Sequence, residues 1–140
     1  MSGVEVNYLA VVLAALSTMV VGSVWYTPKV FGTTWIKLAK LDEKKMKEAG
    51  PYPIVVTLIV SLISAYVLAH IAYLSNQFFQ NSFLQDSLMT AFWVWLGFVA
   101  SRFITHDAFE IRRKKLTVIN ISHELVTFMV MGLIIGLMGF

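Results

Sequence analysis

The sequence contains no cysteine, few charged residues and no basic residue over long stretches. The absence of cysteine excludes disulfides, thiolate metal sites and thiol nucleophiles. Charged residues make up only 14% of the chain and apolar residues 58%, with a mean hydropathy of +0.74. Soluble domains usually carry about 25% charged residues. This deficit of charge indicates a protein that lies in a lipid bilayer.

Basic residues occur in two short stretches only, one between Pro28 and Gly50 and the other between Arg102 and Lys115. Lysine and arginine beside apolar segments are typical of contacts with anionic lipid headgroups. The net charge of +3 therefore does not predict a nucleic-acid partner. The partner that the composition predicts is the lipid bilayer itself.

Four apolar segments are long enough to cross a membrane, at about residues 8–26, 54–73, 84–104 and 116–139. Each has about the 20 residues that a ~30 Å hydrocarbon layer requires of a helix. The backbone must be helical there, because lipid offers no partner for a free N–H or C=O group. The prediction is a single all-α transmembrane domain over residues 1–140. The first segment lacks a positive n-region and is too long for a signal peptide, so we expect it to be retained.

The charge pattern also predicts an orientation. The connections at residues 27–53 and 105–115 are basic, whereas residues 74–83 carry no lysine or arginine. Basic loops stay in the cytoplasm, so both termini are expected outside. The first connection holds two short predicted helices, Trp35 to Lys40 after a Thr34 cap and Glu43 to Ala49 after an Asp42 cap. Phe31, Trp35 and Leu38 recur at helical spacing and give the first of these an apolar face. It lies flat on the inner leaflet or belongs to a solvated connector, and the sequence leaves both open. A capping box from Ser82 to Gln85 predicts the start of the third span.

Small residues recur every four positions on the first and last segments. The first carries Ala10, Ala14, Thr18 and Gly22, and the last carries a GxxxG at Gly132 and Gly136. Such ridges let two helices approach closely. Two hypotheses follow: a compact four-helix monomer, or a subunit contact through the Gly132/Gly136 face. Because four helices enclose only a thin interior, we expect a homo-oligomer or a subunit of a larger membrane complex.

Polar residues inside the membrane concentrate on the last segment, at Asn120, His123, Glu124 and Thr127. Glu124 lies about 12 Å along the helix from Leu116. A carboxyl group at that depth takes up a proton or finds a cation. One hypothesis is a structural ion pair with Arg102 of the third segment. The other is a proton-binding carboxylate on a transport path.

Metal and cofactor sites are not predicted. His70 lies near the opposite surface from His106 and His123, which argues against a bis-histidine haem. His123 and Glu124 are neighbours expected to diverge around the helix, which argues against zinc. Nucleotide-binding and hydrolase motifs are absent from the sequence. We therefore expect a non-enzymatic protein without a cofactor.

Several local motifs resemble a known family. The opening Val6-Asn7-Tyr8-Leu9-Ala10-Val11, the turn Trp25-Tyr26-Thr27-Pro28 with Phe31-Gly32, and the later Trp95-Leu96-Gly97-Phe98, Phe109-Glu110-Ile111-Arg112 and Ile119-Asn120 carry the resemblance. They are similar to a family of small bacterial four-helix membrane proteins catalogued as a conserved domain of unknown function. The resemblance implies four spans and a bacterial inner-membrane location, and it implies no activity. Two functions therefore stay open: a self-associating or accessory membrane protein, and a small proton-linked transporter or channel subunit.

Overall fold

The computed structural model describes residues 3–140, and the described chain is built from helices. The helices are α1 (Tyr8–Trp25), α2 (Gly32–Ala39), α3 (Glu43–Ala49), α4 (Tyr52–Phe79), α5 (Phe83–Val94), the π-helical η1 (Trp95–Ala100), α6 (Ser101–Phe109) and α7 (Lys114–Met138). Segments α5, η1 and α6 form one continuous helix, Phe83–Phe109. Together with α1, α4 and α7, it gives four helices long and apolar enough to span a membrane. The predicted all-α fold with four spans is confirmed.

Two spans are longer than predicted, which shortens the loops between them. The second span continues past residue 73 to Phe79, and the third runs from Phe83 to Phe109 instead of stopping at residue 104. The amide-rich stretch after residue 73 contains no Gly or Pro, so the helix continues beyond the apolar segment until Gln80 adopts a left-handed conformation with φ of 57°. Hydropathy therefore marked the membrane-crossing part and not the helix end.

Helix caps follow the sequence signals in two of three cases. Ser82 accepts a hydrogen bond from the Gln85 amide at the start of α5, and Asp42 accepts one from the Lys44 amide at the start of α3. The third prediction is wrong, because α2 begins at Gly32 and not after a Thr34 cap. The Gly32 amide donates to the Thr27 carbonyl, which draws the chain into a turn ahead of the predicted start.

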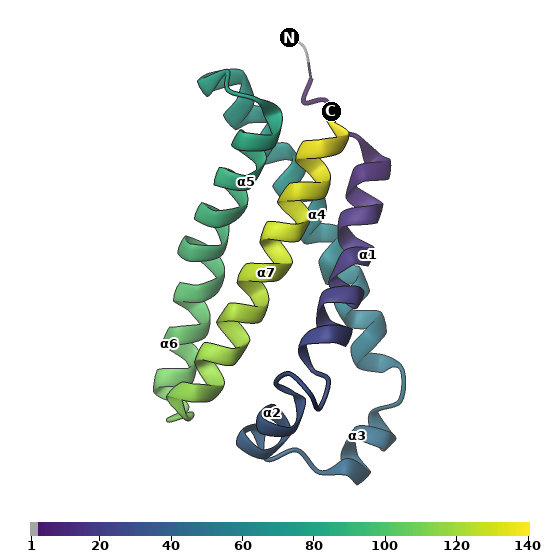
Figure 1. Cartoon of the computed structure of the whole chain (residues 1–140), viewed down its shortest axis with the longest axis vertical. Helices are drawn as coiled ribbons and strands as arrows, with labels where there is room; N and C mark the ends of the chain where they lie inside the picture. Colours follow the sequence, from purple (N-terminus) through teal and green to yellow (C-terminus); the bar gives the residue numbers. More distant parts are fainter. Residues whose placement is uncertain (1–2) are drawn as a thin grey trace.

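The four spans form an up-and-down bundle in which α7 packs against α1 and α5, and α4 packs against α1 and α5 on the other side. Both termini and the α4–α5 turn lie at one end of this bundle (Figure 1). Helices α2 and α3 and the α6–α7 turn lie at the other end, which we call the basic end because the two basic stretches of the sequence meet there.

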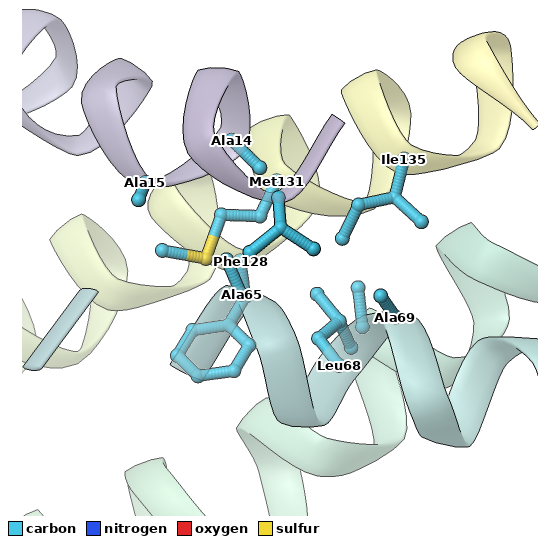
Figure 2. Packing of buried hydrophobic residues seen from close by; sticks show 10 residues of the cluster. Ala14, Ala15, Ala65, Leu68, Ala69, Phe128, Met131 and Ile135 are labelled. Atoms are coloured by element: carbon cyan, nitrogen blue, oxygen red, sulfur yellow. The ribbon is translucent and has the colours of Figure 1, made fainter. Parts of the chain in front are cut away.

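The core combines alanine faces with larger side chains from α7 and α4. Ala14 and Ala15 of α1 and Ala65 and Ala69 of α4 are buried, and Figure 2 shows Phe128, Met131 and Ile135 of α7 packed with Leu68 among them. Small faces permit close van der Waals contact, which is the main attraction between helices where lipid surrounds them. Large apolar side chains such as Val20, Ile63 and Phe98 point outward, as expected of surfaces that face lipid.

The predicted small-residue ridges are helix contacts within the chain. A Cβ atom on Gly132 would lie 2.8 Å from Ala91 Cβ, and one on Gly136 would lie 2.7 Å from Leu84 Cα. The GxxxG therefore forms the seam between α7 and α5. The expected subunit contact through this face is wrong, because α5 of the same chain covers it.

The ridge on α1 behaves in the same way. Ala10, Ala14 and Thr18 are buried, and the Thr18 hydroxyl lies 3.0 Å from the Ser61 hydroxyl of α4. Gly22, the last member of the ridge, lies opposite His123 of α7. The α1 ridge thus lies against α4 and α7 of the same chain.

Candidate functional site

A cavity of about 730 Å³ lies between α1, α4 and α7 in the half of the bundle nearer the basic end. It forms between these helices because α4 packs against α1 and α5 but makes little contact with α7. Its polar lining includes groups from all three helices: Thr18 and Ser23 of α1, Thr57, Ser61 and Ser64 of α4, and His123, Glu124 and Thr127 of α7. Apolar side chains, among them Val60, Phe128 and Met131, line the rest. The sequence did not predict this cavity.

Three of the four predicted polar residues of the last span line this cavity. His123, Glu124 and Thr127 face it, and Asn120 lies next to it, one helical turn nearer the basic end. Spacings of three and four residues place all of them on one side of α7. The structure therefore brings together the α7 residues that the sequence grouped.

His123 and Glu124 contact each other, contrary to the sequence expectation. The imidazole Nδ1 of His123 lies 3.3 Å from Glu124 Oε1. Their Cβ atoms diverge by about 100° around the helix, but the three torsions of the glutamate side chain let its carboxylate turn back toward the ring. Both side chains are largely buried, with exposed fractions of 14% and 28%. The carboxylate is thus held beside a histidine at the cavity wall.

The predicted ion pair between Arg102 and Glu124 is not formed. Arg102 is exposed on α6, whereas Glu124 faces α1 and α4 across the cavity. Within residues 3–140, the side chain paired with Glu124 is His123. The prediction failed because the sequence of a span shows which residues share a depth in the membrane. It does not show toward which neighbouring helix each side chain points. Glu124 therefore has no cationic partner from the third span.

Two polar atoms at the cavity have no hydrogen-bond partner among the described residues. They are Nε2 of His123 and Oγ1 of Thr127, and Thr127 is only 5% exposed. A buried polar atom without a partner costs about 1–3 kcal/mol. Both atoms are themselves buried, and Nε2 of His123 lies 3.7 Å from the position of a Cβ built on Gly22 of α1.

Aromatic side chains close the cavity toward the basic end. Tyr26, just past the end of α1, and Trp35 of α2 have ring centroids 4.8 Å apart. The Tyr26 ring also lies 4.9 Å from the His123 ring. Burial, together with the neighbouring Glu124 carboxylate, raises the pKa of Tyr26 to about 12. The Tyr26 hydroxyl therefore stays protonated at neutral pH.

Trp35 fixes α2 against the bundle. Its indole Nε1 donates to Asn120 Oδ1 of α7 at 3.1 Å. The apolar face predicted for this helix therefore packs at least partly against protein. The sequence placed Trp35 on the apolar side but gave no sign of its partner, which is 85 residues away.

A second hollow of about 680 Å³ lies beyond this aromatic wall, between α2 and the α6–α7 turn. We call it the vestibule. It is lined by Lys40, Arg112 and Arg113, and it shares Tyr26, Trp35 and Glu124 with the cavity. The turn beside it is fixed by the buried Asp107, which accepts a hydrogen bond from Thr117 Oγ1 at 2.6 Å. Glu124 and the two aromatic residues thus separate a basic, surface-facing hollow from a largely apolar one.

The opposite end of the bundle holds a polar cluster that sequence reasoning missed. Asp86 of α5, only 2% exposed, accepts hydrogen bonds from the side-chain amides of Asn76 and Asn81 at 2.8 and 2.9 Å. The signal was an acidic residue in the first turn of a predicted span, next to an amide-rich loop. Since both oxygens have amide donors, the cluster fixes the α4–α5 turn. His70 lies earlier on α4, where its Nδ1 contacts the Tyr66 carbonyl at 3.0 Å.

The fold and the site together define a multi-pass α-helical membrane protein with an intramembrane cavity. Within residues 3–140, no three His, Asp or Glu side chains are grouped to hold a metal ion. The chain belongs to the family described as protein of unknown function (DUF1761), which it matches over residues 9–136. The family confirms the resemblance drawn from the sequence motifs and assigns no activity. Comparison with curated proteins and with solved structures gave no match.

Proposed function

We propose that this protein is a small, non-enzymatic transporter or transporter subunit that binds a solute in the cavity and exchanges it for a proton on Glu124. The observation that carries the proposal is the position of Glu124, which lines both the cavity and the vestibule. A carboxylate that lines both hollows can exchange a proton with the vestibule and contact a solute in the cavity. Ionisable residues inside membrane spans commonly mark such pathways.

The supporting features are the size and polarity of the cavity. Its volume of about 730 Å³ lies within the range of about 300–1,000 Å³ that small-molecule sites occupy. Its wall is mainly apolar, with a few polar groups converging from α1, α4 and α7. His123 and Thr127 line this cavity and each has a buried polar atom without a partner in the described chain. A purely structural cluster would be expected to satisfy these groups within the protein.

We also propose the bacterial inner membrane as the location, with the basic end in the cytoplasm and both termini outside. The support is the common position of α2, α3 and the α6–α7 turn at one end of the bundle (Figure 1). Residues 27–53 and 105–115 would then face the cytoplasm, in line with the distribution of positive charge. The partners in this proposal are the bilayer and the solute, with no nucleic acid and no cofactor.

The experiment is a proton-flux assay on the purified chain in liposomes that enclose a pH-sensitive dye. Hydrophobic cations, anions and neutral solutes are added in turn. We expect at least one class to move protons in the wild type and to lose most of that effect in Glu124→Gln. The matched control is Glu48→Gln, which removes an exposed carboxylate from α3. If no solute of any class moves protons in a Glu124-dependent way, the proposal is wrong.

A second candidate function is self-association or an accessory role in a larger complex. The observation in its favour is that Gly97 and Ser101 are four residues apart and both exposed on the third span. Nothing lies within 4 Å of a Cβ built on Gly97. A small-residue ridge that faces outward suits close contact with another helix. Gly97→Leu should then dissociate an assembly measured by light scattering after mild detergent extraction, and a monomeric wild type would refute the idea.

A further inference from the structure

We propose that the cavity binds a compact hydrophobic monocation. This inference rests on the proposed function and names its solute by chemical class. The occupant would place its positive charge beside the Glu124 carboxylate and its apolar groups against the aromatic and aliphatic wall.

Charge is the first argument. Glu124 is the one residue with a formal charge among the described residues that line the cavity. Its contact in the chain is the imidazole of His123, and Arg102 is directed elsewhere. An ionised carboxylate in a largely apolar site needs a positive partner. A single bound cation, or a proton in its absence, meets that need.

The surrounding rings are the second argument. Tyr26, Trp35 and Phe128 all line the cavity that Glu124 faces. The face of an aromatic ring carries partial negative charge and attracts cations, most strongly when water is excluded. A carboxylate with three rings in the same wall therefore matches an organic cation better than a neutral solute.

The position of the basic residues also favours a cation as the occupant of the cavity. No lysine or arginine is among the cavity-lining residues within the described chain, and Lys40, Arg112 and Arg113 line only the vestibule. Arg112 there is paired with Glu110. The cavity-lining residues Ile54, Val56 and Val60 of α4 are themselves exposed on the bundle surface. A hydrophobic cation can therefore approach from the bilayer side without passing the basic vestibule.

Competition with protons follows from the single carboxylate. The titratable and charged groups that face Glu124 are its neighbour on α7, the tyrosine after α1, and the vestibule residues of α2 and the α6–α7 turn: His123, Tyr26, Lys40, Glu110, Arg112 and Arg113. A proton on Glu124 removes the negative charge that holds the cation. Protonation of His123 adds a positive charge beside it. Both changes make acid pH weaken cation binding.

The test uses tetraphenylphosphonium and tetraphenylborate, two ions of nearly the same shape and opposite charge. Binding of each to the purified full chain in lipid nanodiscs is measured by equilibrium dialysis. We expect tetraphenylphosphonium to bind the wild type and Glu48→Gln equally, and Glu124→Gln at least tenfold more weakly. Glu124→Asp, which keeps the charge, should retain most of the binding. Any residual binding of tetraphenylborate should not be weakened in Glu124→Gln.

The result that overturns the inference is equal tetraphenylphosphonium binding by the wild type and Glu124→Gln, or tetraphenylborate binding by the wild type that is lost in Glu124→Gln. If Glu124→Gln does not fold, the wild type alone decides, because lowering the pH must weaken tetraphenylphosphonium binding and must not weaken tetraphenylborate binding. Absence of tetraphenylphosphonium binding at every pH also overturns it. Proton flux driven only by anions or neutral solutes would refute the monocation and leave proton exchange standing. Glu124-dependent cation binding without proton flux would support the monocation and refute proton exchange.

Discussion

Trp35 and Asn120 connect the first connecting segment to the last span through one hydrogen bond, with indole Nε1 and Oδ1 3.1 Å apart. The bond joins the short helix α2 to the polar side of α7. It also keeps the Trp35 ring beside Tyr26, where the two rings separate the cavity from the vestibule. The position of α2 therefore determines whether the two hollows are separate.

The first prediction concerns this bond. Trp35→Phe removes the indole donor and should release α2, at a cost of about 1 kcal/mol in the free energy of unfolding. Trypsin should then cut the detergent-solubilised protein faster at Lys37 and Lys40. Trp25→Phe is the matched control, because the Trp25 Nε1 has no partner among the described residues. Equal cleavage rates in the two variants would show that the bond does not hold α2.

The second prediction concerns the seam between α5 and α7. Gly132→Ala puts a Cβ atom 2.8 Å from Ala91 Cβ and 3.0 Å from the Ser87 carbonyl oxygen. The two helices must move apart, so we expect a loss of about 1–3 kcal/mol, measured by thermal unfolding in detergent. Gly97→Ala, which meets nothing within 4 Å, should be neutral or stabilising. A Gly132→Ala protein as stable as the wild type would contradict the close packing.

The third prediction concerns the buried carboxylate at the end opposite the basic one. Asn76→Ala removes one of the two amide donors to Asp86 and should lower the free energy of unfolding by about 1–3 kcal/mol. Gln77→Ala, an exposed amide one residue along the helix, should change it little. The comparison is made by denaturation in one detergent. Similar values for both variants would mean that the amide network does not stabilise the turn.

The fourth prediction concerns orientation, and the absence of cysteine makes it simple to test. A Gln77→Cys protein should react with a membrane-impermeant maleimide in intact cells. A Lys44→Cys protein should react only after the inner membrane is permeabilised. The reason is that basic segments are retained on the cytoplasmic side. The opposite pattern of labelling would invert the proposed topology.

The predictions divide according to whether they depend on residues close together in the chain or on the direction in which a helix faces. The spans, the Ser82 and Asp42 caps and the polar group on α7 were all predicted, because each depends on residues close together in the chain. The Arg102 pair and the GxxxG subunit contact were wrong, because both depend on which way a helix faces. The Trp35 contact and the Asp86 cluster were missed, since their donors and acceptors come from different helices.

The sequence by itself determined that this chain makes four apolar helices with its basic residues at the connections of one side. Hydrocarbon requires every backbone group to be bonded within its own helix, so length and hydropathy suffice to predict the spans. Tertiary structure alone decided the rotation of each helix about its axis. Lipid is as apolar as most side chains on these helices, so composition gives little information on which face turns inward. Close packing at Gly132 and Gly136, and the separation of α4 from α7, turned Glu124 toward a cavity and away from Arg102.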